Sequence, residues 1–207
     1  HYRFDNYLNR CCENYPTHEL GPIAKLLDIN RGNRIMTVSS FASKSAGLSE
    51  YIKTRVDATD EMKAANFAQG DIITTVLTCA RGETILLRLD TTLPRSYSRD
   101  FTVRGTKGLY MQDTNSVFLD GDEESFEPVE YYKKALNNAV KFEDEYLPGI
   151  WKNVTEETLK AGHGGMDWFA YMGFTNALIN GEEMPVDVYD AATWQAVAVL
   201  SEMSIKQ

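Results

Sequence analysis

Two of the three histidines lie in segments whose glycines and prolines constrain the backbone. His18 ends the run Tyr15-Pro16-Thr17-His18, and His163 sits between Gly162 and the pair Gly164-Gly165. An imidazole with an ordinary pKa near ~6.5 accepts or donates a proton at neutral pH. Constrained loops that carry such groups are typical of binding and catalytic sites. The two segments are therefore the first candidates for chemistry.

The segment from Tyr15 to His18 is predicted to lie at the start of a helix. Free backbone N–H groups and the helix dipole at such an edge favour a ligand oxygen, and a sugar hydroxyl would suit it. The phenol of Tyr15 can both donate and accept a hydrogen bond. The alternative is structural: Thr17 caps the helix and His18 is a satisfied, buried imidazole.

The loop around His163 precedes a second predicted helix, which begins with Met166, Asp167 and Trp168. His163 either moves a proton from a tightly turned backbone or is simply solvated in a turn between two helices. Asp167 either binds a hydroxyl or caps its helix. Arg95 and Tyr97 follow a predicted strand, where they either reach a substrate or form surface contacts.

The composition excludes several classes of function. The 207 residues carry a net charge of −9, which argues against a nucleic-acid partner. No apolar run approaches the ~20 residues that a membrane span needs, so no membrane partner is expected. The three cysteines form no disulfide or zinc pattern, which indicates a reducing, cytoplasmic location and no metal. No pair of acids stands out for ordinary glycosidase chemistry, in which two carboxyl groups lie ~5 to 9 Å apart.

The hydrophobic patterns predict an α+β protein with an open, mostly antiparallel β-sheet and helices packed on one face. The length favours a single domain over residues 1–207. Residues 57–68 are expected to form a loop, and 105–108 to close a hairpin. The expected strands are 34–42, 71–79, 83–90, 98–104, 108–112 and 116–119; the expected helices are 19–27, 43–55, 131–146, 155–160, 165–179 and 189–204.

Four segments resemble the C-terminal domain of the Gfo/Idh/MocA oxidoreductase superfamily, in the branch that includes NAD-dependent family 109 glycoside hydrolases. They occur in the expected order: YPTHELGPIAKLLDINRG (15–32), DTTLPRSYSRDFTVRGTKG (90–108), GHGGMDW (162–168) and PVDVYDAATW (185–194). In this family a Rossmann domain precedes the present one and holds most of the NAD. The chain itself has no GxGxxG fingerprint, and no cofactor-binding residue is assigned in it. Its first residue is His1, so we expect a fragment of a longer protein.

The resemblance implies an NAD-dependent sugar oxidoreductase, inactive as this fragment alone. The alternatives are a family 109-type glycosidase and a non-catalytic oligomerisation scaffold. Tyr15 and His18 match positions that contact sugar hydroxyls, and His163 matches a proposed acid/base. Asp167, Arg95 and Tyr97 are further candidate substrate-binding residues. The family also implies a homo-oligomer formed through the open sheet face. We expect His18 and His163 to share one pocket.

Overall fold

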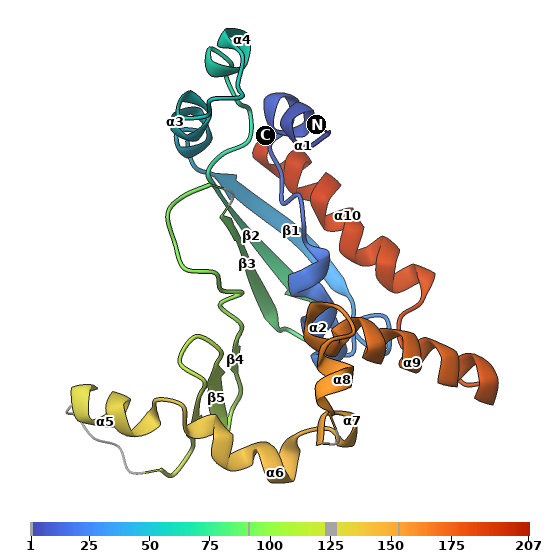
Figure 1. Ribbon diagram of the computed structural model, residues 1–207. Helices are drawn as coiled ribbons and strands as arrows, with labels where there is room; N and C mark the ends of the chain where they lie inside the picture. Colours follow the sequence, from blue (N-terminus) through green and yellow to red (C-terminus); the bar gives the residue numbers. More distant parts are fainter. Residues whose placement is uncertain (1, 91, 123–127, 153) are drawn as a thin grey trace. The chain divides into compact units, whose positions relative to one another are not determined.

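The computed structural model describes residues 2–90, 92–122, 128–152 and 154–207 (Figure 1). The chain divides into two compact units, which are described separately. Unit 1 comprises His1–Ser96 and Val186–Gln207, and unit 2 comprises Tyr97–Pro185. The single domain expected from the sequence stays a prediction. Among the described residues, no helix combines the length and the apolar character needed to cross a membrane.

Unit 1 is built on a three-stranded antiparallel sheet. Its strands are β1 (Ile35–Ala42), β2 (Ile72–Cys79) and β3 (Thr84–Asp90), in the order β1-β2-β3. The hairpin between β2 and β3 turns at Gly82, whose φ of 97° suits a residue without a Cβ. The helices of this unit are α1 (Tyr2–Asn9), α2 (Thr17–Leu26), α3 (Gly47–Lys53), α4 (Asp60–Lys63) and α10 (Val188–Ile205).

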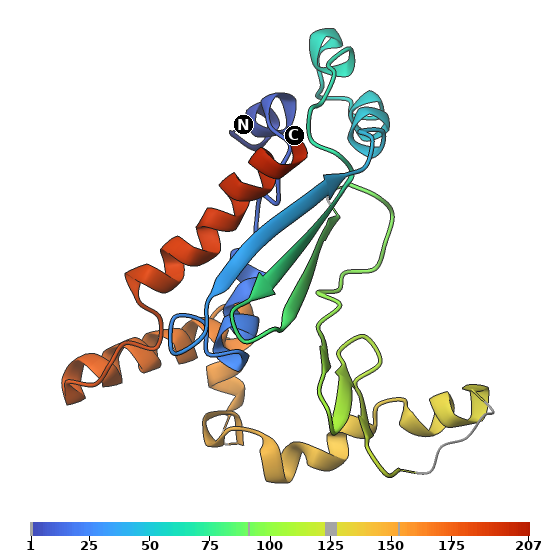
Figure 2. The ribbon, with the colours of Figure 1, turned by 180° about the vertical axis from the view of Figure 1, so that it is seen from behind.

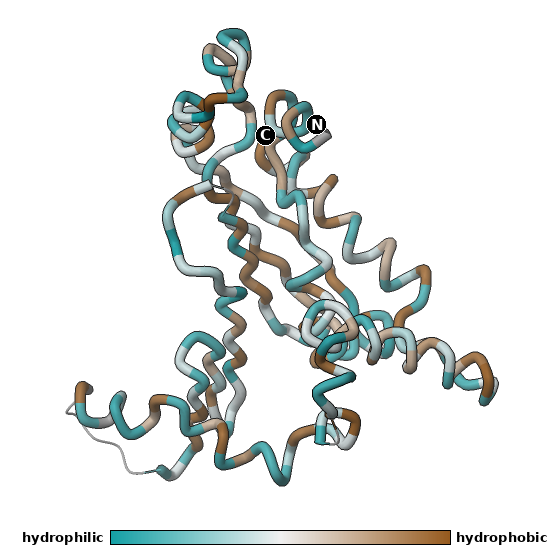
Figure 3. Tube along the Cα trace, viewed as in Figure 1, coloured by the Kyte–Doolittle hydropathy of each residue, from teal (hydrophilic) through white to brown (hydrophobic). Residues whose placement is uncertain are grey.

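One face of this sheet carries the core. Alternate residues of β2 are buried, because successive side chains of a strand point to opposite faces. The traces of β2 and β3 contain many hydrophobic residues (Figure 3). Helices α2 and α10 lie on the buried face (Figure 2). The core residues are Leu20, Ala24, Ile29, Leu77, Cys79, Ile85, Leu87 and Val197.

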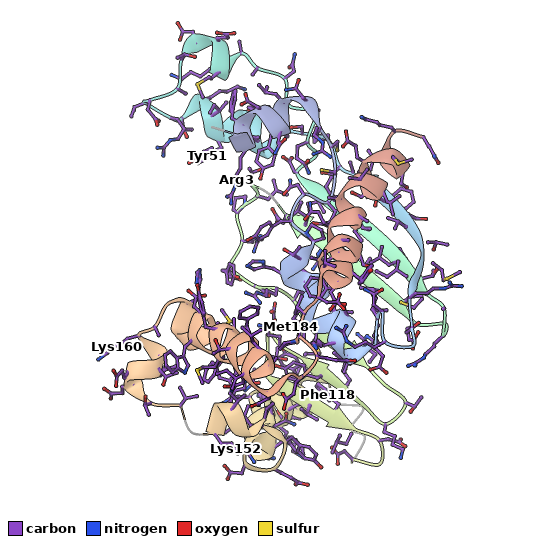
Figure 4. All side chains as sticks on the ribbon, turned by 90° about the vertical axis from the view of Figure 1, so that its right-hand side faces the viewer. Arg3, Tyr51, Phe118, Lys152, Lys160 and Met184 are labelled. Atoms are coloured by element: carbon purple, nitrogen blue, oxygen red, sulfur yellow. The ribbon has the colours of Figure 1, made fainter. Side chains whose placement is uncertain are left out.

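Unit 2 has a second antiparallel sheet, formed by β4 (Thr102–Arg104), β5 (Gly108–Met111) and β6 (Ser116–Leu119). The turn between β4 and β5 is closed by the bond from the Gly105 N–H to the Gly108 carbonyl, at 2.8 Å, as predicted. The helical segments of this unit are α5 (Pro128–Ala135), η1 (Asn138–Phe142), α6 (Glu143–Tyr146), α7 (Gly149–Lys152), α8 (Glu156–Leu159), η2 (His163–Gly165) and α9 (Met166–Asn180). Lys152, labelled in Figure 4, donates from Nζ to the Asp144 carbonyl at 2.5 Å.

The predicted α+β class, antiparallel pairing and helices on a sheet face are confirmed. Several details differ from the sequence expectation. The described strands form two small sheets, one in each unit. The helix predicted over 131–146 is interrupted at Asn137, which adopts a left-handed conformation with a φ of 58°. The predicted 57–68 loop contains α4, which Thr59 caps. Helix α1 was not predicted at all.

The helix predicted over 43–55 begins only at Gly47, and the reason lies outside its own sequence. The buried carboxylate of Asp71 accepts hydrogen bonds from the backbone N–H groups of Ala46 and Gly47, at 2.9 Å each. An acidic group that satisfies these free N–H groups fixes the start of the helix. Residues 43–46 are thereby left outside it.

Candidate functional site

Tyr15 and His18 form a side-chain pair at the start of α2. Their ring centroids are 4.5 Å apart, with a tilt of 34° between the rings. The Tyr15 hydroxyl lies 3.5 Å from His18 Nε2, at the outer limit of hydrogen bonding. Both side chains are exposed. A phenol and an imidazole presented together to solvent can bind a hydroxyl and exchange its proton.

Two parts of the structural alternative for this segment, the Thr17 cap and the buried His18, are wrong. Pro16, not Thr17, occupies the N-cap position, and no side chain caps the helix there. Thr17 is the first helical residue, and the Leu20 N–H donates to the Pro16 carbonyl at 2.9 Å. His18 is exposed rather than buried. The N-terminal edge of α2 therefore has no capping side chain and carries an accessible imidazole.

In unit 2, His163 pairs with Asp167. Nδ1 of His163 lies 3.0 Å from both carboxylate oxygens of Asp167. A carboxylate only accepts hydrogen bonds, so the hydrogen of a neutral imidazole lies on Nδ1 and Nε2 is left to accept a proton. This is the arrangement in which a carboxylate orients a histidine for acid/base work. Gly165, not Asp167, is the N-cap of α9.

The φ angles of this loop explain why it contains three glycines. Gly162, His163, Gly164 and Gly165 all have positive φ angles, between 43° and 92°. A side chain at Gly162 would collide with the Asp167 carboxylate. The loop therefore needs glycine to turn and also to leave room for the His163–Asp167 pair.

Arg95 and Tyr97 have different environments. The Arg95 guanidinium lies 3.4 Å from an Asp90 carboxylate oxygen and donates to the Ser96 carbonyl at 3.1 Å. These local contacts brace the turn after β3. Tyr97 is exposed, and its hydroxyl oxygen accepts from Arg99 Nε at 3.4 Å. Tyr97 is thus free to meet a ligand, whereas Arg95 is largely occupied within its own turn.

The candidate site residues form two pairs, one in each unit. Tyr15 and His18 belong to unit 1, and His163 and Asp167 belong to unit 2. A pocket shared by both histidines joins residues of separate units and so stays a prediction. Within the described ranges, His, Cys, Asp and Glu side chains gather nowhere in a group of three that could hold a metal ion.

One buried acid next to the site was not predicted from the sequence. Glu13, two residues before Tyr15, is only 2% exposed. Burial and the nearby Glu19 charge raise the pKa of its carboxyl to about 8, while a hydrogen bond from the Tyr15 backbone opposes this rise. Glu13 is therefore largely protonated at neutral pH. No sequence pattern distinguishes it from the chain's other acids.

Comparison with known proteins identifies the family. The family model "Glycosyl hydrolase 109, C-terminal domain" matches residues 1–207. This chain belongs to glycosyl hydrolase family 109. A family 109 protein of Stenotrophomonas maltophilia is 42% identical over 205 residues, which cover 99% of this chain and 43% of that protein. The match with the C-terminal domain agrees with the resemblance found in the sequence.

Two other relatives have more specific names. An alpha-N-acetylgalactosaminidase of Tannerella forsythia is 37% identical over 207 residues, which cover 99% of this chain and 42% of that protein. Another alpha-N-acetylgalactosaminidase, of Shewanella oneidensis, is 34% identical over 192 residues, which cover 92% of this chain and 41% of that protein. The chain thus spans about two-fifths of the length of the curated relatives it matches.

Proposed function

We propose that this chain is the sugar-binding, C-terminal part of a longer NAD-dependent family 109 glycosidase that acts on α-N-acetylgalactosaminides. The observation that carries the proposal is the exposed Tyr15–His18 pair at the uncapped start of α2, in a chain that matches the family domain over its whole length. The sugar class comes from the names of the two relatives from Tannerella and Shewanella. The relatives favour the glycosidase over the dehydrogenase that the sequence resemblance first suggested.

We expect the dinucleotide to be held mainly outside the described residues. Strands β1 to β6 pair only in antiparallel fashion, whereas pyrophosphate binding in a Rossmann fold uses a parallel βαβ unit. NAD would accordingly be held mainly by an accompanying Rossmann domain, the expected partner of this chain. When bound, NAD supplies hydride acceptance from a sugar carbon and hydride return.

This chain contributes hydrogen bonds and proton transfer. Tyr15 and His18 would bind a sugar hydroxyl, and His18 Nε2 would take its proton. His163, oriented by Asp167, would exchange a second proton through its free Nε2. Tyr97 would add a phenol contact to the sugar. An elimination route needs such a second acid/base group, whereas a simple dehydrogenase does not.

Self-association through the exposed face of the unit 1 sheet is part of this proposal. On that face Phe41 is 69% exposed and Leu86 is 67% exposed, opposite the face that α2 and α10 cover. Apolar side chains on an open sheet face favour a protein contact. Sedimentation of the full-length protein and of Leu86→Glu tests this. We expect the variant to sediment as a smaller species, and an unchanged sedimentation coefficient would exclude this face as the interface.

The cellular location is a further part of the proposal. The three cysteines are free in the described structure, and Cys12 and Cys79 are buried. Free thiols fit a reducing compartment, so we propose the cytoplasm. Alkylation of Cys11 by a membrane-impermeant reagent in intact cells would contradict this location.

The decisive experiment uses the full-length protein that contains this chain. We expect release of nitrophenol from a nitrophenyl α-N-acetylgalactosaminide without net accumulation of NADH. Tyr15→Phe, His18→Ala and His163→Ala should each lower kcat by roughly 10²- to 10⁴-fold, the usual range for acid/base groups. Tyr51→Phe, at an exposed tyrosine on α3, is the control for tyrosine loss.

Other outcomes would change the assignment. NADH that accumulates with free sugar would indicate a dehydrogenase instead. Wild-type turnover in His18→Ala and His163→Ala would defeat the catalytic assignment and leave the scaffold alternative.

A further inference from the structure

The segment that leads into the Tyr15–His18 pair is held from both sides by buried side chains. Gln69, 2% exposed, forms two bonds with the backbone of Cys12: its Oε1 accepts the N–H at 3.1 Å, and its Nε2 donates to the carbonyl at 3.0 Å. On α10, the buried Ser201 Oγ accepts the Glu13 N–H at 2.8 Å. These bonds span 57 and 188 residues of sequence, so tertiary structure fixes this segment.

The Glu13 side chain adds a third constraint. The Tyr15 backbone N–H lies near its carboxyl and acts to lower the carboxyl pKa. One carboxyl oxygen, Oε2, is buried without a hydrogen-bond partner among the described residues. A buried carboxylate in this situation would hold an uncompensated charge, whereas a protonated carboxyl avoids that cost. The geometry therefore suits the neutral acid.

We propose that Glu13 is a positioning residue for the Tyr15–His18 pair, acting as a neutral carboxylic acid that holds the Tyr15 backbone. This inference rests on the function proposed above. When Glu13 ionises, its charge must be hydrated, which requires the buried segment to shift. Tyr15 would shift with it, because its backbone is tied to the same carboxyl group. The pair would then lose its placement at the start of α2.

The charged and polar groups around Glu13 define how its carboxyl responds to pH. From α2, Glu19 raises the Glu13 pKa through its negative charge, and His18 directly precedes Glu19 in the chain. From α10, Ser201 is neutral and Glu202 is paired with Arg10 at 2.6 Å. Gln69 is neutral. Activity should therefore fall as pH rises through about 8, where Glu13 gains its charge.

The first test is the pH dependence of kcat/KM in the full-length protein, with a nitrophenyl α-N-acetylgalactosaminide as the probe. We expect an alkaline fall with a midpoint near 8, which should be absent in Glu13→Gln. Glu19→Gln should move the fall to lower pH, because it removes a charge that raises the Glu13 pKa. Glu50→Gln, at an exposed glutamate, is the matched control and should leave the profile unchanged.

The second test compares two replacements at neutral pH. Glu13→Ala should lower kcat about 10- to 100-fold with a smaller change in KM, as expected for misplaced catalytic groups. Glu13→Gln should restore most of that loss, because an uncharged amide oxygen can still accept the Tyr15 N–H. An alkaline fall that persists in Glu13→Gln, or a wild-type kcat in Glu13→Ala, would overturn the proposal.

A third measurement does not depend on turnover. In protein labelled with ¹³C-histidine, the His18 ring signal, assigned by its loss in His18→Ala, should report a titration step near pH 8 that Glu13→Gln removes. If this step is present while no glycoside is cleaved, the proposed function fails and the positioning role stands. If the step is missing or survives in Glu13→Gln, the positioning role is refuted whatever the activity.

Discussion

Replacing Asp190 by asparagine should cost this protein about 2 to 3 kcal/mol of unfolding free energy at neutral pH. Asp190 is 1% exposed and lies in the first turn of α10. Both of its carboxylate oxygens accept from the Arg31 guanidinium, at 2.8 and 2.7 Å. They also accept from Asn30 Nδ2 and from the Asp187 backbone N–H, each at 3.2 Å. The carboxylate thus joins the loop after α2 to the start of α10.

The magnitude follows from the pKa of this carboxyl group. The hydrogen bond from Arg31, the largest cause, lowers the Asp190 pKa from 3.8 to about 2. At 1.36 kcal/mol per unit of pKa, the charged form is favoured by about 2 kcal/mol in the folded state. Asparagine also places an N–H group against the Arg31 donors, which adds to the loss. Because the folded pKa is lowered, this stability is fully present above pH ~4 and disappears as pH falls towards ~2.

The assay is urea unfolding of the full-length protein and of Asp190→Asn, followed by tryptophan fluorescence at several pH values between 2 and 7. The difference in unfolding free energy should be largest above pH ~4 and should shrink on acidification. Asp28→Asn is the matched control, since Asp28 and Arg81 form an exposed pair at 3.1 Å and should contribute less than about 1 kcal/mol. A loss below about 0.5 kcal/mol, or one that does not change with pH, would refute this reasoning.

Three further predictions concern other parts of the fold. Leu77→Ala should lower the unfolding free energy by about 2 to 5 kcal/mol, because Leu77 is fully buried in the core; a loss below about 1 kcal/mol in urea unfolding would contradict this. Asp71→Ala should lower the unfolding free energy by about 1 to 2 kcal/mol, because it removes the hydrogen-bond acceptor at the start of α3. Hydrogen-exchange protection should fall more in α3 than in the other helices, and unchanged protection in α3 would argue against this. Gly162→Ala should lower the unfolding free energy by at least about 1 kcal/mol and lower glycosidase activity, because its φ is 77° and the added Cβ meets Asp167. A wild-type melting temperature together with wild-type turnover would contradict this.

The sequence determined much of the local structure of this protein. Apolar alternation indicated β1, and richness in Ile, Thr, Val and Leu indicated β2 and β3, because such side chains favour extended strands. Glycines marked the hairpin turns and the loop around His163, because positive φ angles restrict the choice of residue. The residues of the YPTH motif also indicated the start of a helix. These features depend on interactions between near neighbours in the chain.

Only the tertiary structure decided how the candidate residues are held. Gln69 binds the Cys12 backbone, and Arg31 binds Asp190, across long stretches of sequence. Glu13 is buried although sequence patterns place acidic residues on the surface. Helix α3 likewise starts where it does because Asp71 lies beside it in space. The pKa of a carboxyl group depends on its burial and on its partners, which exist only once the chain has folded. Neither the burial of a carboxyl group nor its partners can be read from the sequence alone.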